Sequence, residues 1–187
     1  MNHAMIRHII GVVLKIEAVF MLPSVVVAFI YMEKKAMIAF AISIALCFTL
    51  GFLLSRNKPK NTLFFAKEGF VMVALSWIVM SIFGALPFVI SQDIPNFVDA
   101  LFETISGFTT TGASILTNVE ALNKSTLFWR SFTHWIGGMG VFVLILAILP
   151  MADSSLHILK AESPGPSVGK LVPKIRDTAK ILYMIYI

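Results

Sequence analysis

Long apolar runs separated by short polar segments dominate the hydrophobic pattern of this chain. A helix needs about 20 apolar residues to cross about 30 Å of hydrocarbon. Four segments reach that length, at residues 9–31, 36–54, 69–91 and 127–149, and a fifth begins at residue 181. The pattern therefore predicts an all-α polytopic membrane protein.

The segment between the third and fourth apolar runs has a different pattern. Residues 96–107 are compatible with a helix, but such a helix is only about 18 Å long and cannot span the membrane. Asn96 is a suitable N-cap and Gly107 a natural C-terminal stop. Residues 108–114 follow, and their β-branched threonines favour extended backbone. We expect a re-entrant half-helix followed by an extended strand; the alternative is an ordinary Thr/Gly loop between two helices.

The residue types in this loop suit a bare cation. Potassium filters are rings of backbone carbonyls that replace the hydration shell of the ion. Non-helical backbone at membrane depth is tolerated only where it is buried in protein or lines a wet cavity. A half-helix also directs the partial negative charge of its C-terminus toward the middle of the membrane. Thr109, Thr110, Thr111 and Gly112 are therefore candidates for main-chain cation coordination.

Composition and charge support a membrane protein and predict its orientation. The chain is 58% hydrophobic and 13% charged, against about 25% charged in soluble domains. Its net charge of +5 lies mainly in loops 55–68 and 151–180, which the positive-inside bias assigns to the cytoplasm together with the N-terminus. Segment 92–126 then faces outward. Its acids either form a cation-concentrating mouth or are chance loop charge: Asp93, Asp99, Glu103 and Glu120.

We expect the single polar residues within the apolar runs to have structural roles. Glu17 lies deep in the first run and is expected to make a hydrogen bond to a neighbouring helix. Arg130, near the outer end of the fourth run, is expected to snorkel or to pair with an outer acid. Cys47 is the only cysteine, and no catalytic grouping or phosphate loop occurs. We therefore expect no enzyme activity, no cofactor and no nucleic-acid binding.

Four sequence blocks, in the same order, resemble the Trk-type potassium uptake proteins of the TrkH/KtrB/HKT superfamily. The blocks are residues 102–114, residues 128–140, residues 161–166 and residues 173–179. Two additional helices before the first pore unit are similar to the TrkH branch. The resemblance implies four helix–pore loop–helix units in one chain around a central pore.

The resemblance divides the chain into parts and implies that it is an N-terminal fragment. Each unit of the family contributes one filter glycine, and here that glycine is Gly112. The parts are residues 1–68 with two extra transmembrane helices, 69–149 as the first unit with pore helix 96–107 and filter 108–114, 150–180 as a cytoplasmic linker, and 181–187 as the truncated start of the next helix.

The resemblance implies potassium uptake across the inner membrane, with this chain supplying one of four filter quadrants. It further implies a lipid environment, a homodimer of the full-length chain and a cytoplasmic nucleotide-binding regulatory subunit. Some sodium-conducting members of the family that the chain resembles carry serine where Gly112 stands, so the resemblance favours potassium. The alternative is a membrane scaffold or a fragment without transport activity. The implied ion ligands are Thr110, Thr111, Gly112 and Ala113, with potassium at the first three, and the supporting residues are Thr109, Ser114, Gly107 and Glu103.

Overall fold

A computed structural model describes residues 2–57 and 66–140, together with Met184 and Tyr186. Within these residues, three helices are long and apolar enough to cross a membrane, which confirms the predicted all-α membrane fold. The linker 150–180, the end of the predicted span 127–149 and most of residues 181–187 lie outside the described residues. The described helices are α1 (His3–Ile30), α2 (Lys34–Ser55), α3 (Ala66–Ser91), α4 (Phe97–Phe108) and α5 (Lys124–Met139), with a 3-10 turn, η1 (Val119–Ala121).

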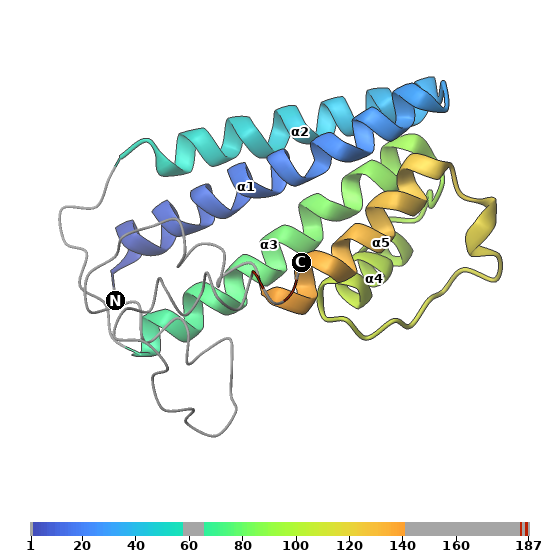
Figure 1. Cartoon of the computed structure of the whole chain (residues 1–187). Coiled ribbons are helices and arrows are strands. Elements are labelled where there is room, and N and C mark those ends of the chain that lie inside the picture. The colour runs from blue at the N-terminus through green and yellow to red at the C-terminus, as the bar shows by residue number, and fades with distance from the viewer. Residues whose placement is uncertain (1, 58–65, 141–183, 185, 187) are drawn as a thin grey trace.

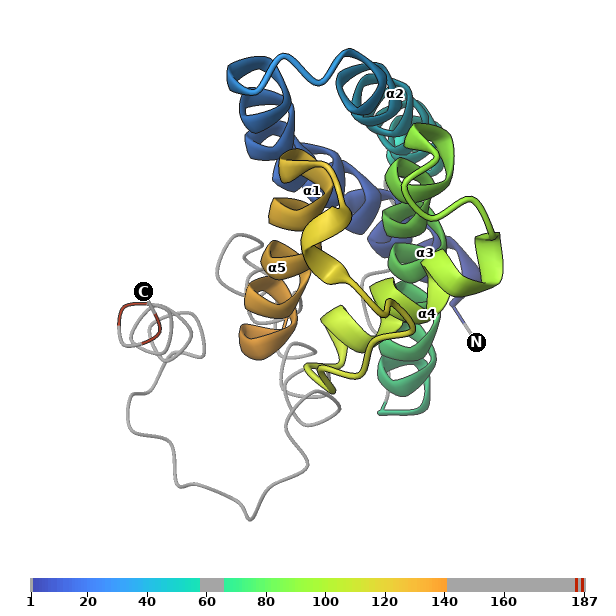
Figure 2. The ribbon, with the colours of Figure 1, turned by 90° about the vertical axis from the view of Figure 1, so that its right-hand side faces the viewer.

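The helices form a long hairpin beside a second group of three. Figure 1 shows α1 and α2 side by side along their lengths, with α3 running next to them. The short α4 and the described part of α5 lie beside the half of α3 that leads to Ser91. Viewed from the end that carries the α4–α5 connection, the C-terminal part of α4 lies between α3 and α5 (Figure 2). This arrangement places the candidate loop at the end of α4 partway along the longer helices.

Two glycines bring α1 and α2 into backbone contact. A Cβ atom added at Gly11 would lie 2.7 Å from the carbonyl oxygen of Gly51, and one added at Gly51 would lie 2.8 Å from that of Gly11. Small residues allow this close approach in membrane helices, where association depends on packing rather than on the hydrophobic effect. The hairpin therefore depends on both positions.

We expect Gly51→Ala to lower the melting temperature of the protein, because the added methyl group would lie 2.8 Å from the Gly11 carbonyl oxygen, which is backbone, as well as 2.9 Å from Lys15 Cγ. Overpacking of this kind costs about 1–3 kcal/mol, more than the roughly 1 kcal/mol that alanine gains over glycine in a helix. The measurement is thermal unfolding in detergent. Ala41→Val, which adds bulk at an exposed position of α2, is the control and should leave the melting temperature unchanged.

The expectation of a hydrogen bond at Glu17 is wrong. The Glu17 side chain is fully buried within α1, and neither carboxylate oxygen has a hydrogen-bond partner in the described part of the chain. Oε1 lies 3.1 Å from the position that a Cβ atom at Gly84 of α3 would take. Glu17 therefore packs against α3 at Gly84, which has no side chain that could donate a hydrogen bond to the carboxylate.

Candidate functional site

Helix α4 begins as the sequence predicts and ends about halfway along α3. The Asn96 side chain accepts a hydrogen bond from the Val98 amide at 2.9 Å and so caps the helix. At the other end, the Phe108 ring lies 5.8 Å from the ring of Trp77, centroid to centroid. Trp77 precedes the end of α3 by roughly four helical turns. The helix therefore runs back along α3 and stops near its middle.

The prediction that Gly107 stops the helix is wrong. The helix continues through Phe108, and Gly107 is buried inside it. A Cβ atom at Gly107 would overlap the Thr133 hydroxyl of α5, and one at Gly137 of α5 would overlap the Phe108 carbonyl. Both glycines therefore serve the close approach of α4 and α5, because no side chain fits between the two helices there.

The helix ends in a turn built by threonines, so residues 108–110 do not form the start of the predicted extended strand. The Thr110 amide donates to the Gly107 carbonyl at 2.9 Å, and the Thr111 amide donates to the Ser106 carbonyl at 3.0 Å. This pair of bonds is the Schellman pattern, in which glycine usually occupies the left-handed position. Here Thr110 occupies it with φ +54°. A β-branched residue is strained in this region, and such strain clusters at functional sites.

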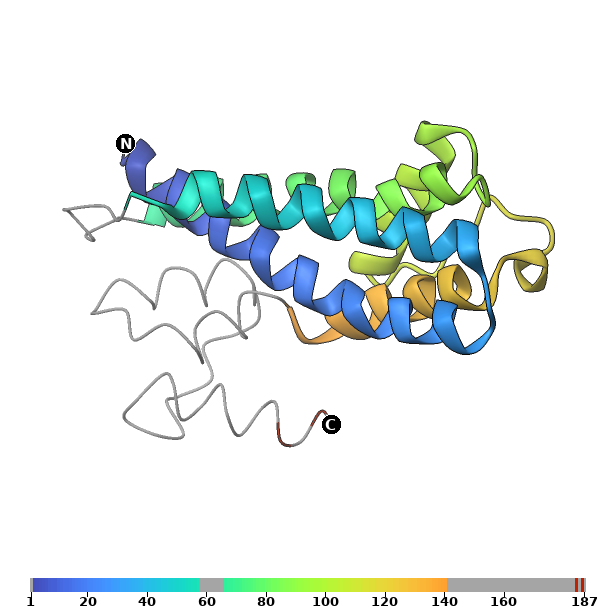
Figure 3. The same ribbon diagram turned by 90° about the horizontal axis from the view of Figure 1, so that it is seen from above.

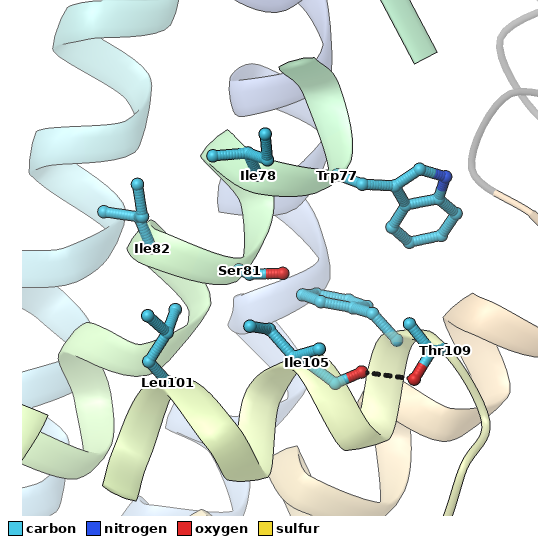
Figure 4. Close-up of a pocket in the computed structure, with 8 residues that line it drawn as sticks. Trp77, Ile78, Ser81, Ile82, Leu101, Ile105 and Thr109 are labelled. Carbon is cyan, nitrogen blue, oxygen red and sulfur yellow. Dashed lines mark hydrogen bonds between the residues drawn. The ribbon is translucent and has the colours of Figure 1, made fainter. Parts of the chain in front are cut away.

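The threonine hydroxyls form hydrogen bonds with one another and with carbonyl groups at the end of the helix. Thr109 Oγ1 donates to the Ile105 carbonyl at 2.8 Å, the bond drawn in Figure 4, and lies 2.8 Å from Thr111 Oγ1. Thr110 Oγ1 donates to the Thr109 carbonyl at 2.7 Å. From Thr111 to Ser114 the backbone has no regular secondary structure. The three threonines therefore hold a tight turn, and the irregular segment starts after it.

Side chains of α4 hold the irregular segment against this helix by hydrogen bonds. Ser106 Oγ donates to the Ala113 carbonyl at 2.6 Å. Glu103 Oε1 accepts from Ser114 Oγ at 2.6 Å and from the Ile115 amide at 2.7 Å. Sequence reasoning missed Ser106, although its place on the same face of α4 as Glu103 was the available signal. The Ala113 carbonyl thus already has one hydrogen-bond partner within the chain.

The Glu103 carboxylate also joins this segment to α5. Arg130 Nε donates to Glu103 Oε2 at 2.8 Å; the Glu103 side chain is 0% exposed and that of Arg130 15%. This confirms the expected pairing of Arg130 with an acid. Burial raises the pKa of Glu103, but hydrogen bonds from Ser114, Arg130 and Ile115 and the Arg130 charge together hold the pKa below its ordinary value. Glu103 is therefore a buried anchor and not an exposed acid of an outer mouth.

The side of the loop away from α4 is open in this chain. Residues 109–115 are exposed, in contrast to the buried face of α4 that holds them. Gly112 has φ +75°, and a Cβ atom added there would have nothing within 4 Å. A cation needs several oxygens on more than one side, so this loop supplies coordination from one direction only.

The nearby cavity is unsuited to a cation. It has a volume of about 240 Å³ and lies between α3 and α4, as Figure 4 shows. Its polar contributions come from Ser81 and Thr109, and its other lining residues are apolar. Across the described residues, no group of three or more His, Cys, Asp or Glu side chains is placed to hold a metal ion. Main-chain oxygens of the loop therefore remain the candidate ligands.

Comparison with known proteins points to a cation transporter family. The family model described as "TrkH: Cation transport protein" matches residues 32–187. The chain is 36% identical to the Trk system potassium uptake protein TrkH of Vibrio parahaemolyticus, covering 100% of this chain and 39% of that protein. It is 34% identical to the Trk system potassium uptake protein TrkG of Escherichia coli, covering 97% and 38%. The chain thus spans about two fifths of the length of these relatives.

Proposed function

Since the chain belongs to the TrkH family of cation transport proteins, we propose that it supplies one of four filter quadrants of a potassium uptake protein. The observation that carries the proposal is the exposed main-chain loop at the end of α4, held from behind by Glu103 and Ser106. A loop fixed in this way can present its main-chain carbonyls to potassium in place of the hydration shell of the ion. A scaffold protein needs no such fastening.

In the proposed mechanism the carbonyl oxygens of Thr110, Thr111 and Gly112 face the permeating ion. The C-terminal end of α4 adds a partial negative charge that favours a cation nearby. Gly112 provides a backbone conformation that a residue with a side chain adopts only under strain. Ala113 contributes less, because its carbonyl already accepts from Ser106. Water and three further loops complete the coordination.

We also propose a topology and a set of partners for the transporter. Residues 1–68 form the extra helix pair and residues 69–149 the first pore unit, followed by a cytoplasmic linker at 150–180. The α1–α2 turn and the α4–α5 connection lie at one end of the helices, whereas the N-terminal residues lie at the other (Figure 3). This supports a cytoplasmic N-terminus and an outer position for both connections. We further propose the inner membrane, a homodimer, a nucleotide-binding regulatory subunit and no enzymatic activity.

The test uses cells that lack their own potassium uptake systems and express the complete transporter. We expect growth at low potassium and uptake of radioactive rubidium, both lost when residues 109–114 are replaced by alanine. Thr117→Ala, an exposed change in the α4–α5 connection, is the control and should leave uptake intact. Wild-type uptake by the alanine variant, at equal amounts in the membrane, would contradict the proposed role of the loop.

A further inference from the structure

A carboxylate from the α1–α2 turn caps a helix that is distant in sequence. Glu33 Oε1 accepts from the Lys124 amide at 2.6 Å, and Oε2 accepts from the Ser125 amide at 3.0 Å and from Ser125 Oγ at 2.6 Å. Both amides belong to the first turn of α5. Figures 1 and 3 show the α1–α2 turn beside the start of this helix. The extra helix pair is thus bonded directly to the pore unit.

Helix α5 lacks a cap of its own. Its N-cap residue, Asn123, makes no side-chain bond to the helix, and the first turn contains no acidic residue. The first amides of a helix have no partner within it, and a negative charge there is favourable. The Asn123 side chain instead donates to Asp93 Oδ1 at 2.7 Å, and Thr126 Oγ1 donates to Asp93 Oδ2 at 2.6 Å. Glu33 therefore provides the cap, and Asp93 holds the same end from the side of α3.

The position of α5 in turn sets the position of the loop. Arg130 lies about one and a half turns beyond Ser125 on this helix. Its Nε reaches Glu103 at 2.8 Å, and Glu103 holds Ser114 and Ile115. A shift or rotation of α5 by about 1 Å would lengthen the Arg130 contact beyond hydrogen-bond range. The path from Glu33 to the loop consists of hydrogen bonds, helix α5 and the Arg130–Glu103 ion pair.

We propose that Glu33 is a positioning residue for the ion filter: by tethering the start of α5 to the α1–α2 hairpin, it fixes the Arg130–Glu103 anchor behind the loop. This rests on the proposed function. It assigns a role to the extra helix pair, which contributes no residue to the loop itself. Glu33 acts through α5 and has no contact with the ion.

The test measures potassium-over-sodium selectivity in the complete transporter, from rubidium uptake in competition with sodium. We expect Glu33→Ala to lower the selectivity ratio by up to about fivefold, because a lost cap changes helix stability by about that factor and the loop feels at most the whole of it, while the protein still reaches the membrane. Glu33→Asp, which keeps the charge, should recover part of the ratio. Glu120→Gln removes an exposed acid from the same end of the molecule and should change nothing. An unchanged ratio in Glu33→Ala would overturn the proposal.

A second variant separates positioning from simple stabilisation of α5. Lys124→Glu in the Glu33→Ala background supplies a local negative charge to the first turn but no tether to the hairpin. We expect the melting temperature to recover and the selectivity ratio to stay low; joint recovery of both would overturn the proposal. A wild-type transporter that takes up no potassium would instead contradict the proposed function, because the Glu33 variants then have no ratio to alter.

Discussion

Replacing Gly112 with serine is expected to reduce the preference for potassium over sodium by about fivefold to thirtyfold. Gly112 has φ +75°, and an L-residue in the left-handed region costs about 1–2 kcal/mol. The backbone relieves this strain by rotating, which turns the flanking carbonyls away from the ion. Every 1.4 kcal/mol is about a tenfold change in an equilibrium, so a loss of this size decides selectivity. The measurement is rubidium uptake against sodium by the complete transporter.

The expected cause is conformational and not steric, because a Cβ atom at Gly112 would have nothing within 4 Å in this chain. The neighbouring position therefore offers a matched control. Ala113→Ser introduces the same hydroxymethyl group one residue later, at a position without positive φ. It should retain selectivity close to wild type. Equal losses of selectivity in the two variants, or an unchanged selectivity ratio in Gly112→Ser, would contradict the proposed role of Gly112.

Features set by residues close together in the sequence were predictable. The three described spans follow from long, mainly apolar runs, and the start of α4 follows from Asn96, whose side chain accepts from the Val98 amide two residues later. The pairing of Arg130 with an acid was also predictable, since a charge near the end of a span needs a partner. What the sequence left open was which acid, because Glu103 lies on another helix 27 residues away.

The end of α4 shows why other features were not predictable. Glycine after a helical run signals either a stop or a close contact, and only the position of α5 decides between them for Gly107. Thr110 favours extended backbone by its own preference, but the two hydrogen bonds of the helix end place it in a left-handed turn. Local propensity was overridden in both cases by contacts formed in the folded molecule.

The cap on α5 could not be predicted from the sequence for a different reason. Glu33 and Ser125 are 92 residues apart, and an acid in a short turn between two spans has no distinguishing pattern. The only signal was negative, since α5 begins without an acidic residue in its first turn. Long-range polar pairing of this kind depends on helix placement, which hydrophobic periodicity does not specify.

Removing Arg130 is expected to have the largest effect on stability. In Arg130→Met the Glu103 carboxylate stays buried without its cation, and breaking such a pair costs about 3–5 kcal/mol. We expect a large fall in melting temperature and loss of uptake, since the carboxylate also holds Ser114 and Ile115. The double variant Glu103→Gln/Arg130→Met should recover much of the melting temperature, because no buried charge remains. A double variant as unstable as Arg130→Met would show that lost packing, and not charge, is responsible.

The same pair predicts a dependence of stability on pH. The folded pKa of Glu103 lies below its ordinary value of 4.5, so folding favours the ionised carboxyl. Its contribution is therefore complete above about pH 4.5 and is lost as the pH falls through the lowered folded pKa. Wild-type protein should lose melting temperature over this acid range more steeply than the double variant, which has no group to titrate there. Glu120→Gln, an exposed change of the same charge, should follow the wild-type curve; parallel curves for wild type and double variant would mean that Glu103 does not stabilise the fold as an anion.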